Sequence, residues 1–346
     1  MKKSLIALAV LAASGAAMAQ SSVTLFGIVD AGVVRISSGG VSKTGLTNSG
    51  LASSRLGFRG EEDLGGGLKA GFWLEGAVAN DNGGSGFNFQ RRSTVGLSGA
   101  FGEVRLGREL TAGYINSTAA DVFGDNGVGA SIGKNLFVSS AAAVNAIETR
   151  KSNMITYLTP ANLGGFYGQL QYSFGEAASN ASYDKANDYL GARVGYRNGP
   201  LEAAVGFAQG RGASAADDVD QFNVFASYDL GVAKAFVGFN QEKNNAPAEV
   251  KYQSYLLGLT APVGPGTVRV SYNDVDLKNS GDDAQKFAIG YVYDLSKRTA
   301  IYGTYAHVKN KGNATYGVSS STSGVHVPAA AGKNVNGYEF GIRHSF

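Results

Sequence analysis

Arginine side chains recur in short segments where every second residue is apolar. In RLGFRG (residues 55–60), Leu56 and Phe58 alternate with charged or small residues. Since successive side chains of a strand point to opposite faces, the arginines of such segments share the polar face. Four arginines have this parity in their segments: Arg55, Arg59, Arg92 and Arg150. Guanidinium is permanently ionised and weakly hydrated, so several such groups along an aqueous passage would bind anions without holding them.

The elements that position these arginines are strands, because alternation of period two recurs from end to end. In residues 166–174, for example, Phe166, Leu170 and Tyr172 fall on one face and the glutamines on the other. Sixteen such segments are predicted: 22–35, 51–61, 68–79, 89–99, 102–109, 150–158, 166–175, 188–197, 201–210, 220–229, 232–242, 251–261, 266–276, 285–294, 298–309 and 336–346. Segments of this length cross a bilayer when tilted by about 45°.

The connections between these segments alternate in length. Short turns follow the even-numbered segments, as at 98–102, 198–200, 230–231 and 294–297, and longer polar stretches follow the odd-numbered ones, as at 36–50, 110–149, 176–187 and 310–335. Closing such a sheet pairs every backbone group, which hydrocarbon demands. The sequence therefore predicts an all-β fold, a 16-stranded antiparallel transmembrane β-barrel with short periplasmic turns and long outer loops.

Composition agrees with a β-rich chain that contains many turns. The 346 residues include 50 Gly, 17 Tyr and 18 Phe but only 6 Pro. Aromatic residues favour pleated surfaces, and glycine supplies tight connections. Cysteine is absent, which excludes a disulfide framework, cysteine-ligated zinc and thiol catalysis. We expect neither a metal nor a cofactor.

The first twenty residues, MKKSLIALAVLAASGAAMAQ, have the pattern of a secretory signal peptide. Two lysines precede an apolar run, and small residues end at Ala19. The run is about half of the roughly 20 residues that a membrane-spanning helix needs. We expect a signal peptide at 1–19 and a single barrel domain at 20–346. Without Lys2 and Lys3 the chain has 28 basic and 27 acidic residues, a net charge near +1 that gives no indication of nucleic-acid binding.

An enzyme built on a membrane barrel is the main alternative from another class. It would need a nucleophile, a base and an orienting group within hydrogen-bond reach. The chain contains only three histidines, His307, His326 and His344, and His344 shares the outward parity of Phe346. We therefore expect no catalytic residues.

Five blocks of the sequence are similar to those of Gram-negative general porins, particularly the trimeric β-proteobacterial group. They are SSVTLFGIVDAGV, SSRLGFRGEEDLGGGLKA, RRSTVGLSGAFGEVRLGRE, SNMITYLTPANLGGFYGQLQYSFGE and YEFGIRHSF, in the order of the family and across essentially the whole mature chain. The resemblance implies a passive diffusion channel in the outer membrane of a Gram-negative bacterium. It also implies a homotrimer, a third loop folded inward to narrow the pore, and Phe346 as the assembly signal.

The resemblance also implies a constriction lined by Arg55, Arg92 and Arg150, with Arg108 as a further candidate at a strand end where parity is unreliable. Asp121 and Asp125 in the 110–149 loop are the candidates for an opposing acidic group. Residues 120–127, ADVFGDNG, lack the proline that the family often carries there, so the acidic half is less well defined. Alternatively, some arginines pair with Glu61, Glu75 or Glu103 on the wall, and the aspartates are solvated loop charges.

Anion preference is expected if arginines outnumber acids at the narrowest point. The partners expected of such a protein are outer-membrane lipid, lipopolysaccharide and the barrel-assembly machinery. A substrate-specific channel and an adhesin that binds through its outer loops remain alternatives, because loops such as SSSTSGVHVPAAAGKN resemble exposed, tolerant tips.

Overall fold

The computed structural model of the protein describes residues 22–84, 86–134, 136, 147–318 and 325–346. The expected signal peptide, with its cleavage point after Ala19, lies outside the described residues. The elements are β1 (Ser22–Ser38), β2 (Val41–Asn48), β3 (Arg55–Gly65), β4 (Leu68–Ala77), β5 (Arg92–Gly99), β6 (Gly102–Leu110), α2 (Ala112–Ser117), β7 (Arg150–Leu158), β8 (Phe166–Ser173), β9 (Tyr189–Asn198), β10 (Leu201–Gly210), η1 (Ala215–Asp217), β11 (Val219–Asp229), β12 (Lys234–Asn244), β13 (Lys251–Val263), β14 (Gly266–Leu277), β15 (Ala284–Asp294), β16 (Thr299–Asn310) and β17 (Val335–Ser345). Among these, neither helix is long and apolar enough to cross a membrane.

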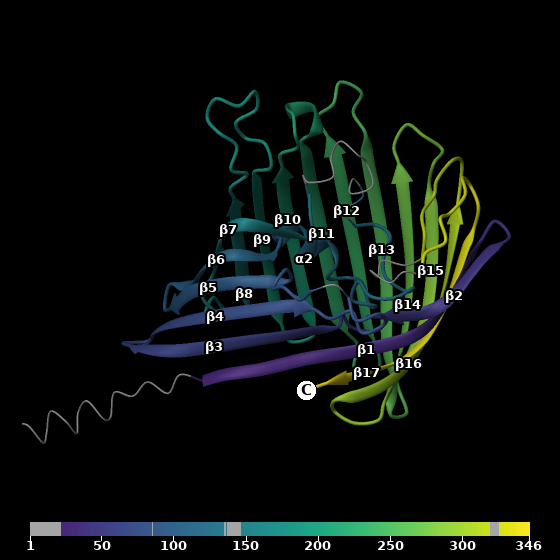
Figure 1. Ribbon diagram of the computed structural model, residues 1–346, viewed down its shortest axis with the longest axis horizontal. Coiled ribbons are helices and arrows are strands. Elements are labelled where there is room, and N and C mark those ends of the chain that lie inside the picture. Colours follow the sequence, from purple (N-terminus) through teal and green to yellow (C-terminus); the bar gives the residue numbers. More distant parts are fainter. Residues whose placement is uncertain (1–21, 85, 135, 137–146, 319–324) are drawn as a thin grey trace, which may run out of the picture.

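The seventeen strands form a closed antiparallel barrel with sixteen wall positions (Figure 1). β1 pairs with β17 through residues 28–38, which closes the sheet. On its other side β1 pairs with β3 through residues 22–28 and with β2 through residues 31–38. β2 and β3 therefore lie end to end and share the second position. The predicted 16-stranded barrel is confirmed.

The interruption between β2 and β3 corrects the predicted second strand. The sequence pattern places a loop at 36–50 and a strand at 51–61, whereas β2 occupies Val41–Asn48 and β3 begins at Arg55. The carboxylate of Asp30 on β1 accepts the backbone N–H groups of Leu51 and Ala52 at 2.8 and 2.7 Å. These bonds hold residues 49–54 off the strand ladder, and alternation along the chain cannot reveal such a contact.

The alternation of short and long connections is confirmed. The turn between β9 and β10 is only Gly199-Pro200, with Gly199 at a φ of 54°, a conformation that glycine adopts without steric cost. Loops at the opposite end of the barrel are longer, for example residues 174–188 between β8 and β9. Both predicted ends of the β4–β5 loop are inexact, since β4 ends at Ala77 rather than 79 and β5 begins at Arg92 rather than 89.

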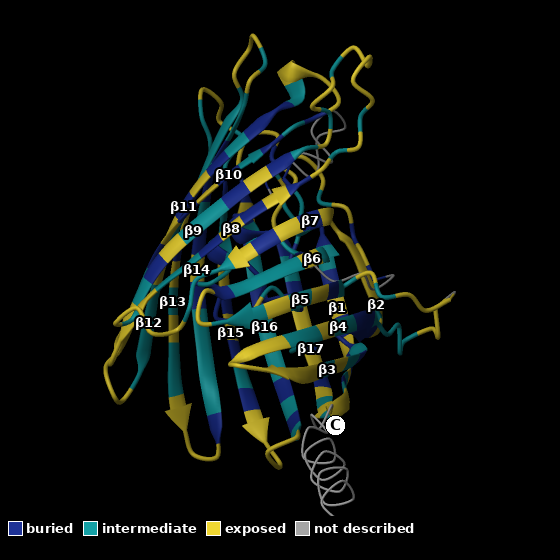
Figure 2. Cartoon of the chain, turned by 90° about the vertical axis from the view of Figure 1, so that its left-hand side faces the viewer, coloured by how far each residue is buried: buried dark blue, intermediate teal, exposed yellow. Residues whose placement is uncertain are grey.

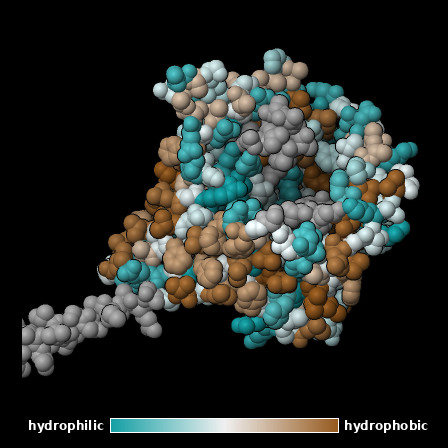
Figure 3. Space-filling model, viewed as in Figure 1, coloured by the Kyte–Doolittle hydropathy of each residue, from teal (hydrophilic) through white to brown (hydrophobic). Residues whose placement is uncertain are grey.

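The outward face of the barrel is apolar. Exposed and buried residues alternate along the strands, as Figure 2 shows for β8–β10. Large exposed apolar side chains occur on the outward parity of most strands; examples are Val23, Leu25, Val95, Leu106, Leu170, Val194, Val205, Leu257, Phe340 and Ile342. Figure 3 shows hydrophobic residues over the outer wall and hydrophilic residues around a hollowed mouth. Such an apolar outer surface is stable in contact with the hydrocarbon of a membrane.

The long connection between β6 and β7 enters the barrel, as predicted for the third loop. It begins with α2, whose N-cap residue Thr111 accepts the backbone N–H of Tyr114 at 3.3 Å. α2 packs against the inner face of the wall from β8 to β12. There Gln171 accepts the N–H of Ala112 at 2.5 Å, and the side chains of Asn116 and Asn223 are joined at 2.7 Å.

Beyond α2 the loop continues along the inner wall and is bound to strands between β12 and β17. Wall side chains meet its backbone at successive points: Asn240 donates to Gly133, Lys286 donates to Ala130, Asn273 accepts from Ile132, Glu242 accepts from Leu136 and Glu339 accepts from Val128. Each such bond contributes about 0.5–1.5 kcal/mol net, and more where a charged group takes part. The loop is therefore held against the inner wall from β8 to β17.

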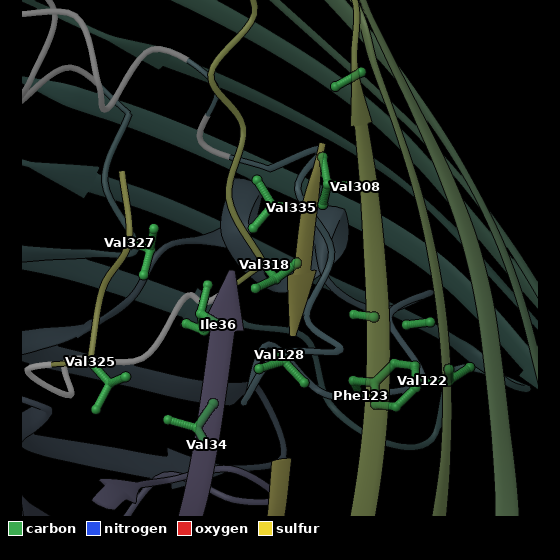
Figure 4. Packing of buried hydrophobic residues seen from close by; sticks show 13 residues of the cluster. Val34, Ile36, Val122, Phe123, Val128, Val308, Val318, Val325, Val327 and Val335 are labelled. Atoms are coloured by element: carbon green, nitrogen blue, oxygen red, sulfur yellow. The ribbon is translucent and has the colours of Figure 1, made fainter. Parts of the chain in front are cut away.

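Apolar contacts complete the attachment of the loop. Val122, Phe123 and Val128 from the loop pack against Val34 and Ile36 of β1 and against valines of β16 and β17 (Figure 4). Phe123 is only 4% exposed, although it lies inside a barrel that is open to water. Burial of an aromatic side chain stabilises this arrangement by about 1.5–3 kcal/mol.

Candidate functional site

Three residues of the lumenal wall form an ion-pair cluster at the height of the loop. The carboxylate of Glu75 on β4 lies 2.6 Å from Nε of Arg91 and 3.4 Å from Nη1 of Arg55 on β3. Glu75 also accepts from Nε1 of Trp73 at 3.1 Å. Pairing on the wall, one of the alternatives left open by the sequence, thus applies to Arg55. A cluster of two guanidiniums and one carboxylate still carries a net positive charge.

Arg59 and Arg92 are held differently, by the only tryptophan of the chain. The guanidinium carbon of Arg92 lies 4.5 Å from the Trp73 ring centroid, and that of Arg59 lies 5.2 Å from it. Such cation–π contacts contribute about 0.5–2 kcal/mol each and neutralise no charge. Neither arginine has an ion pair among the described residues. The polar-face parity predicted for Arg55, Arg59 and Arg92 agrees with these contacts.

The orientation of the Arg150 side chain does not follow from the alternation of side chains along β7. In the pairing of β6 with β7, the single residue Arg108 lies opposite two residues, Ser152 and Asn153. This two-to-one pairing is a β-bulge, and Asn153 within it has a φ of 53°. Parity counted from the rest of β7 does not carry through this bulge. The contacts of Arg150 place it nonetheless, because its Nε donates to the carbonyl oxygen of Arg91 at 2.8 Å.

Arg108 lies at the rim rather than among the other arginines. It pairs with Ser93, on the outward parity of β5. Its Nε donates to the carbonyl of Gln90 at 2.7 Å, and its Nη1 donates to the hydroxyl of Ser152 at 2.9 Å. Arg108 still borders the central cavity from this position.

The acidic candidates on the loop are both engaged. The carboxylate of Asp121 accepts three backbone N–H groups of its own loop, from Phe123 at 2.9 Å, Asp125 at 3.1 Å and Ser131 at 2.8 Å. Asp125 is contacted by the hydroxyl of Tyr114 and by the amine of Lys134. Asp121 therefore braces the loop, while the charge of Asp125 is balanced by Lys134.

This environment shifts the pKa values of two loop side chains. Burial lowers the pKa of Lys134 to about 8, although nearby Asp121 opposes the shift. Burial raises the pKa of Tyr114, while Arg150 and Arg91, which line the same cavity, lower it. Raising the pH through 8 removes the positive charge of Lys134 and leaves Asp125 less well balanced.

The loop residues and the arginines Arg91, Arg108 and Arg150 meet at a cavity of about 1430 Å³ bounded by the ends of β2, β4, β6 and β7, the third loop and the outer loops. Its charged lining residues are Asp81, Arg91, Arg108, Asp125, Lys134, Glu148 and Arg150. Four of these seven are basic. Arg55, Arg59 and Arg92 lie on the adjoining wall, where Glu75 compensates Arg55 while Arg59 and Arg92 have no ion pair among the described residues.

Three functional residues were missed from the sequence. Arg91 lies within the predicted strand 89–99 at the parity opposite to Arg92, so alternation assigns it an outward position, whereas the observed β5 begins only at Arg92. Lys134 lies in a loop without periodicity. Trp73 does have the inward parity of Glu75, and a lone tryptophan on the polar face of a strand was a signal that could have been used.

Residues 129–133 also have the GxSxG spacing that is typical of serine hydrolases, a motif that the sequence-based expectations overlooked. The hydroxyl of Ser131 donates to Oδ1 of Asn273 at 2.9 Å, and its N–H donates to Asp121. His307 and His344 bond to Asn336 and Thr299 of the wall strands. The described residues therefore give Ser131 no histidine base, and the motif serves the loop anchor.

A closed antiparallel barrel with an apolar outer wall, an inward loop and a charged lumen defines the class of outer-membrane channels. The family model described as Gram-negative porin matches residues 5–313. The chain is 49% identical to outer membrane porin protein 32 of Delftia acidovorans, over all of both chains. It is 32% identical to an outer membrane porin protein of Bordetella pertussis, with 90% of this chain and 95% of the relative covered.

Solved structures agree with these relatives. An anion-selective porin from Comamonas acidovorans superposes with a TM-score of 0.87 at 44% identity, covering 94% of this chain and 100% of the other. OmpF of Salmonella typhi, at 16% identity over 94% of this chain and 97% of the other, has a TM-score of 0.67 and shares the fold. The chain belongs to the Gram-negative porin family. It is a passive diffusion channel of the outer membrane.

Proposed function

We propose that this porin prefers small anions, and that the preference is set by Arg55, Arg59, Arg92, Arg108 and Arg150 against Asp121 and Asp125. One observation supports this above the others: Glu75, Asp121 and Asp125 are each bound by several groups, whereas several arginines have no carboxylate partner. Glu75 is shared by two guanidiniums, and Asp121 is bound by three N–H groups. Arg59, Arg92 and Arg150 have no carboxylate partner among the described residues. Their charges are available to passing anions.

The 44% identical structural relative is itself described as anion-selective, which favours the same preference here. We propose no catalytic activity and no cofactor; the hydrolase-like spacing at residues 129–133 has no histidine base among the described residues. We also propose that residues 1–19 are removed by signal peptidase and that residues 20–346 form the mature barrel.

We propose a homotrimer on the basis of the outer wall. Aromatic residues mark the upper membrane interface along one side of the barrel: Phe207, Phe222, Phe239, Tyr255, Tyr272, Phe287, Tyr305 and Tyr338. At the corresponding end of β3 and β4 the aromatic residues form a compact cluster instead: Phe87 lies over Gly76, and the ring of Phe89 contacts those of Phe58 and Phe87. A compact aromatic patch of this kind is suited to contact with neighbouring copies. A trimeric form is recorded for OmpT of Vibrio cholerae, which shares the fold.

Phe346 is proposed as the signal read by the barrel-assembly machinery. Its backbone exchanges hydrogen bonds with Gly27, N to O and O to N at 3.1 Å, so the last residue completes the closing seam. Deleting Phe346 is expected to reduce the folded, heat-modifiable band on unboiled gels by about half or more, because both the seam and the outward aromatic side chain are lost. Phe346→Tyr serves as the control and should assemble normally. Equal assembly of the deletion variant would exclude this role.

Swelling of proteoliposomes in sugars of graded size tests the diffusion function. Rates are expected to fall smoothly with sugar size and to rise in proportion to concentration, because a water-filled passage selects by size. A substrate-specific channel would show saturation of the swelling rate for one solute. An adhesin on the same barrel would show no dependence of the swelling rate on sugar size. Saturation at millimolar concentration would therefore favour the substrate-specific alternative.

A further inference from the structure

Arg35 is the only charged residue on the outward face of β1, and it stands at a defined height. The outward positions before it are apolar or small: Val23, Leu25, Gly27, Val29, Ala31 and Val33. From Val23 to Val33 the strand rises about 33 Å at ~3.3 Å per residue, or about 25 Å along the membrane normal at a tilt of ~40°. This is the height of the apolar band of a membrane barrel. Arg35 is thus the first outward residue of the headgroup layer.

The guanidinium of Arg35 is oriented by two hydroxyl groups of β2. Nη1 donates to Oγ1 of Thr44 at 3.2 Å, and Nη2 donates to Oγ of Ser42 at 3.0 Å. The side chain is exposed and has no carboxylate partner within the described chain. Arginine carries five N–H donors in a planar fork that matches phosphate oxygens, and only two are used here.

Residues on the neighbouring strands extend this feature. Arg35 pairs with Tyr338 of β17, which in turn pairs with Tyr305 of β16, and the two rings lie 4.9 Å apart. Tyrosines at this height are typical of the membrane–water interface. His307 and then Lys309 follow on the outward face of β16, towards the outer loops. A cationic and aromatic surface therefore spans β1, β17 and β16.

The sector that contains this surface has an uncommon charge pattern. The chain has 27 acidic residues, yet residues 31–60 and 299–338 contain none. These two stretches build β1, β2 and β16 above the apolar band, and the loop before β17. Basic residues remain there, including the exposed Lys309 and Lys333. By contrast, β14 carries the outward Asp274 on the same rim.

We propose that Arg35, together with Lys309 and His307, binds the phosphate of a phosphorylated glycolipid in the outer leaflet. The guanidinium takes the phosphate, and Tyr305 and Tyr338 contact the sugar and the first carbons of the acyl chains. The occupant is a lipid rather than free phosphate because the site lies directly on the apolar band and beside interfacial tyrosines. This site is on the outside of the barrel and is independent of the proposed anion preference.

The test uses full-length mature protein refolded in detergent without lipopolysaccharide. Lipid A that carries its phosphates is titrated onto the wild type, Arg35→Gln and the control Arg298→Gln, and bound lipid is counted by native mass spectrometry. Arg298 is an exposed arginine in the turn at the opposite end of the barrel. Loss of a charge-assisted phosphate contact is expected to weaken binding to Arg35→Gln by about tenfold or more, and Arg298→Gln should match the wild type.

Two further titrations identify which molecule binds at Arg35. Dephosphorylated lipid A should bind the wild type no better than Arg35→Gln binds the phosphorylated form, and inorganic phosphate at the same concentration should not compete. Equal lipid binding by wild type and Arg35→Gln, or competition by inorganic phosphate, would overturn the proposal. So would dissociation of lipid-free Arg35→Gln oligomers, because Arg35 would then contact another copy. Conductance and ion selectivity should be unchanged in Arg35→Gln, so failure here leaves the pore proposal standing.

Discussion

Removal of residues 119–133 from the third loop is expected to raise the single-channel conductance about twofold or more, because the narrowest cross-section limits ion flow. This segment lies inside the barrel, along the inner wall between α2, which packs on β8–β12, and Glu339 on β17. Its removal leaves α2 and its wall contacts in place. Conductance in 1 M salt is the appropriate measurement, because the Debye length is then about 3 Å and fixed charge contributes little.

Deletion of residues 178–186 is the matched control for the loop experiment. These residues lie in the outer loop between β8 and β9 and do not border the central cavity. Conductance should be unchanged in this control, while folding, read from heat-modifiable mobility, should be normal in both variants. A folded third-loop deletion with unaltered conductance would show that another part of the lumen is the narrowest.

The second large effect is expected from Arg92→Glu, which changes the charge of the passage by two units. A unit charge about 4 Å from an ion contributes about 1 kcal/mol even in water, so the reversal changes the energy of a passing anion by about 2 kcal/mol. Since about 1.4 kcal/mol corresponds to tenfold, the anion-to-cation permeability ratio should fall by more than tenfold in dilute salt. Arg92 has no ion pair within the described part of the chain, so this position should be more sensitive than Arg55, which Glu75 already compensates.

Arg298→Glu provides the control for charge reversal. It makes the same change of two units, but in the exposed turn between β15 and β16, outside the passage. Its selectivity should remain close to that of the wild type. If Arg92→Glu and Arg298→Glu behaved alike, the guanidinium stacked on Trp73 would not contribute to the passage.

The regular part of the fold was accessible from the sequence because lipid and water impose a strict alternation on a barrel wall. Leu56 and Phe58 fix the inward parity of Arg55 and Arg59, and register pairing confirms it. Alternation does not predict side-chain orientation where residues leave the hydrogen-bonded ladder of the strands. The bulge at Ser152 and Asn153 and the segment 49–54 held by Asp30 are both set by contacts between distant residues.

The candidate site could be predicted only in part, for the same reason. Its wall arginines follow from parity, but their ionic partners do not. The sequence leaves open whether Asp121 is a free loop charge, and the structure engages it with three backbone N–H groups. The roles of Lys134 and Trp73 depend on how the loop lies inside the barrel and on which side chains share a register row. Such pairings are properties of the closed barrel.

The reversal potential of the unmodified porin across a salt gradient tests the central claim most directly. If uncompensated arginines govern the passage, the potential should indicate anion preference and should grow as salt falls. The Debye length is about 10 Å at 0.1 M and about 30 Å at 0.01 M, so fixed charge fills the passage only in dilute salt. An anion-to-cation permeability ratio above one that increases from 1 M to 0.01 M potassium chloride is the predicted result. A ratio below one, or one that does not depend on salt, would contradict the account, because the carboxylates would then equal or outweigh the arginines.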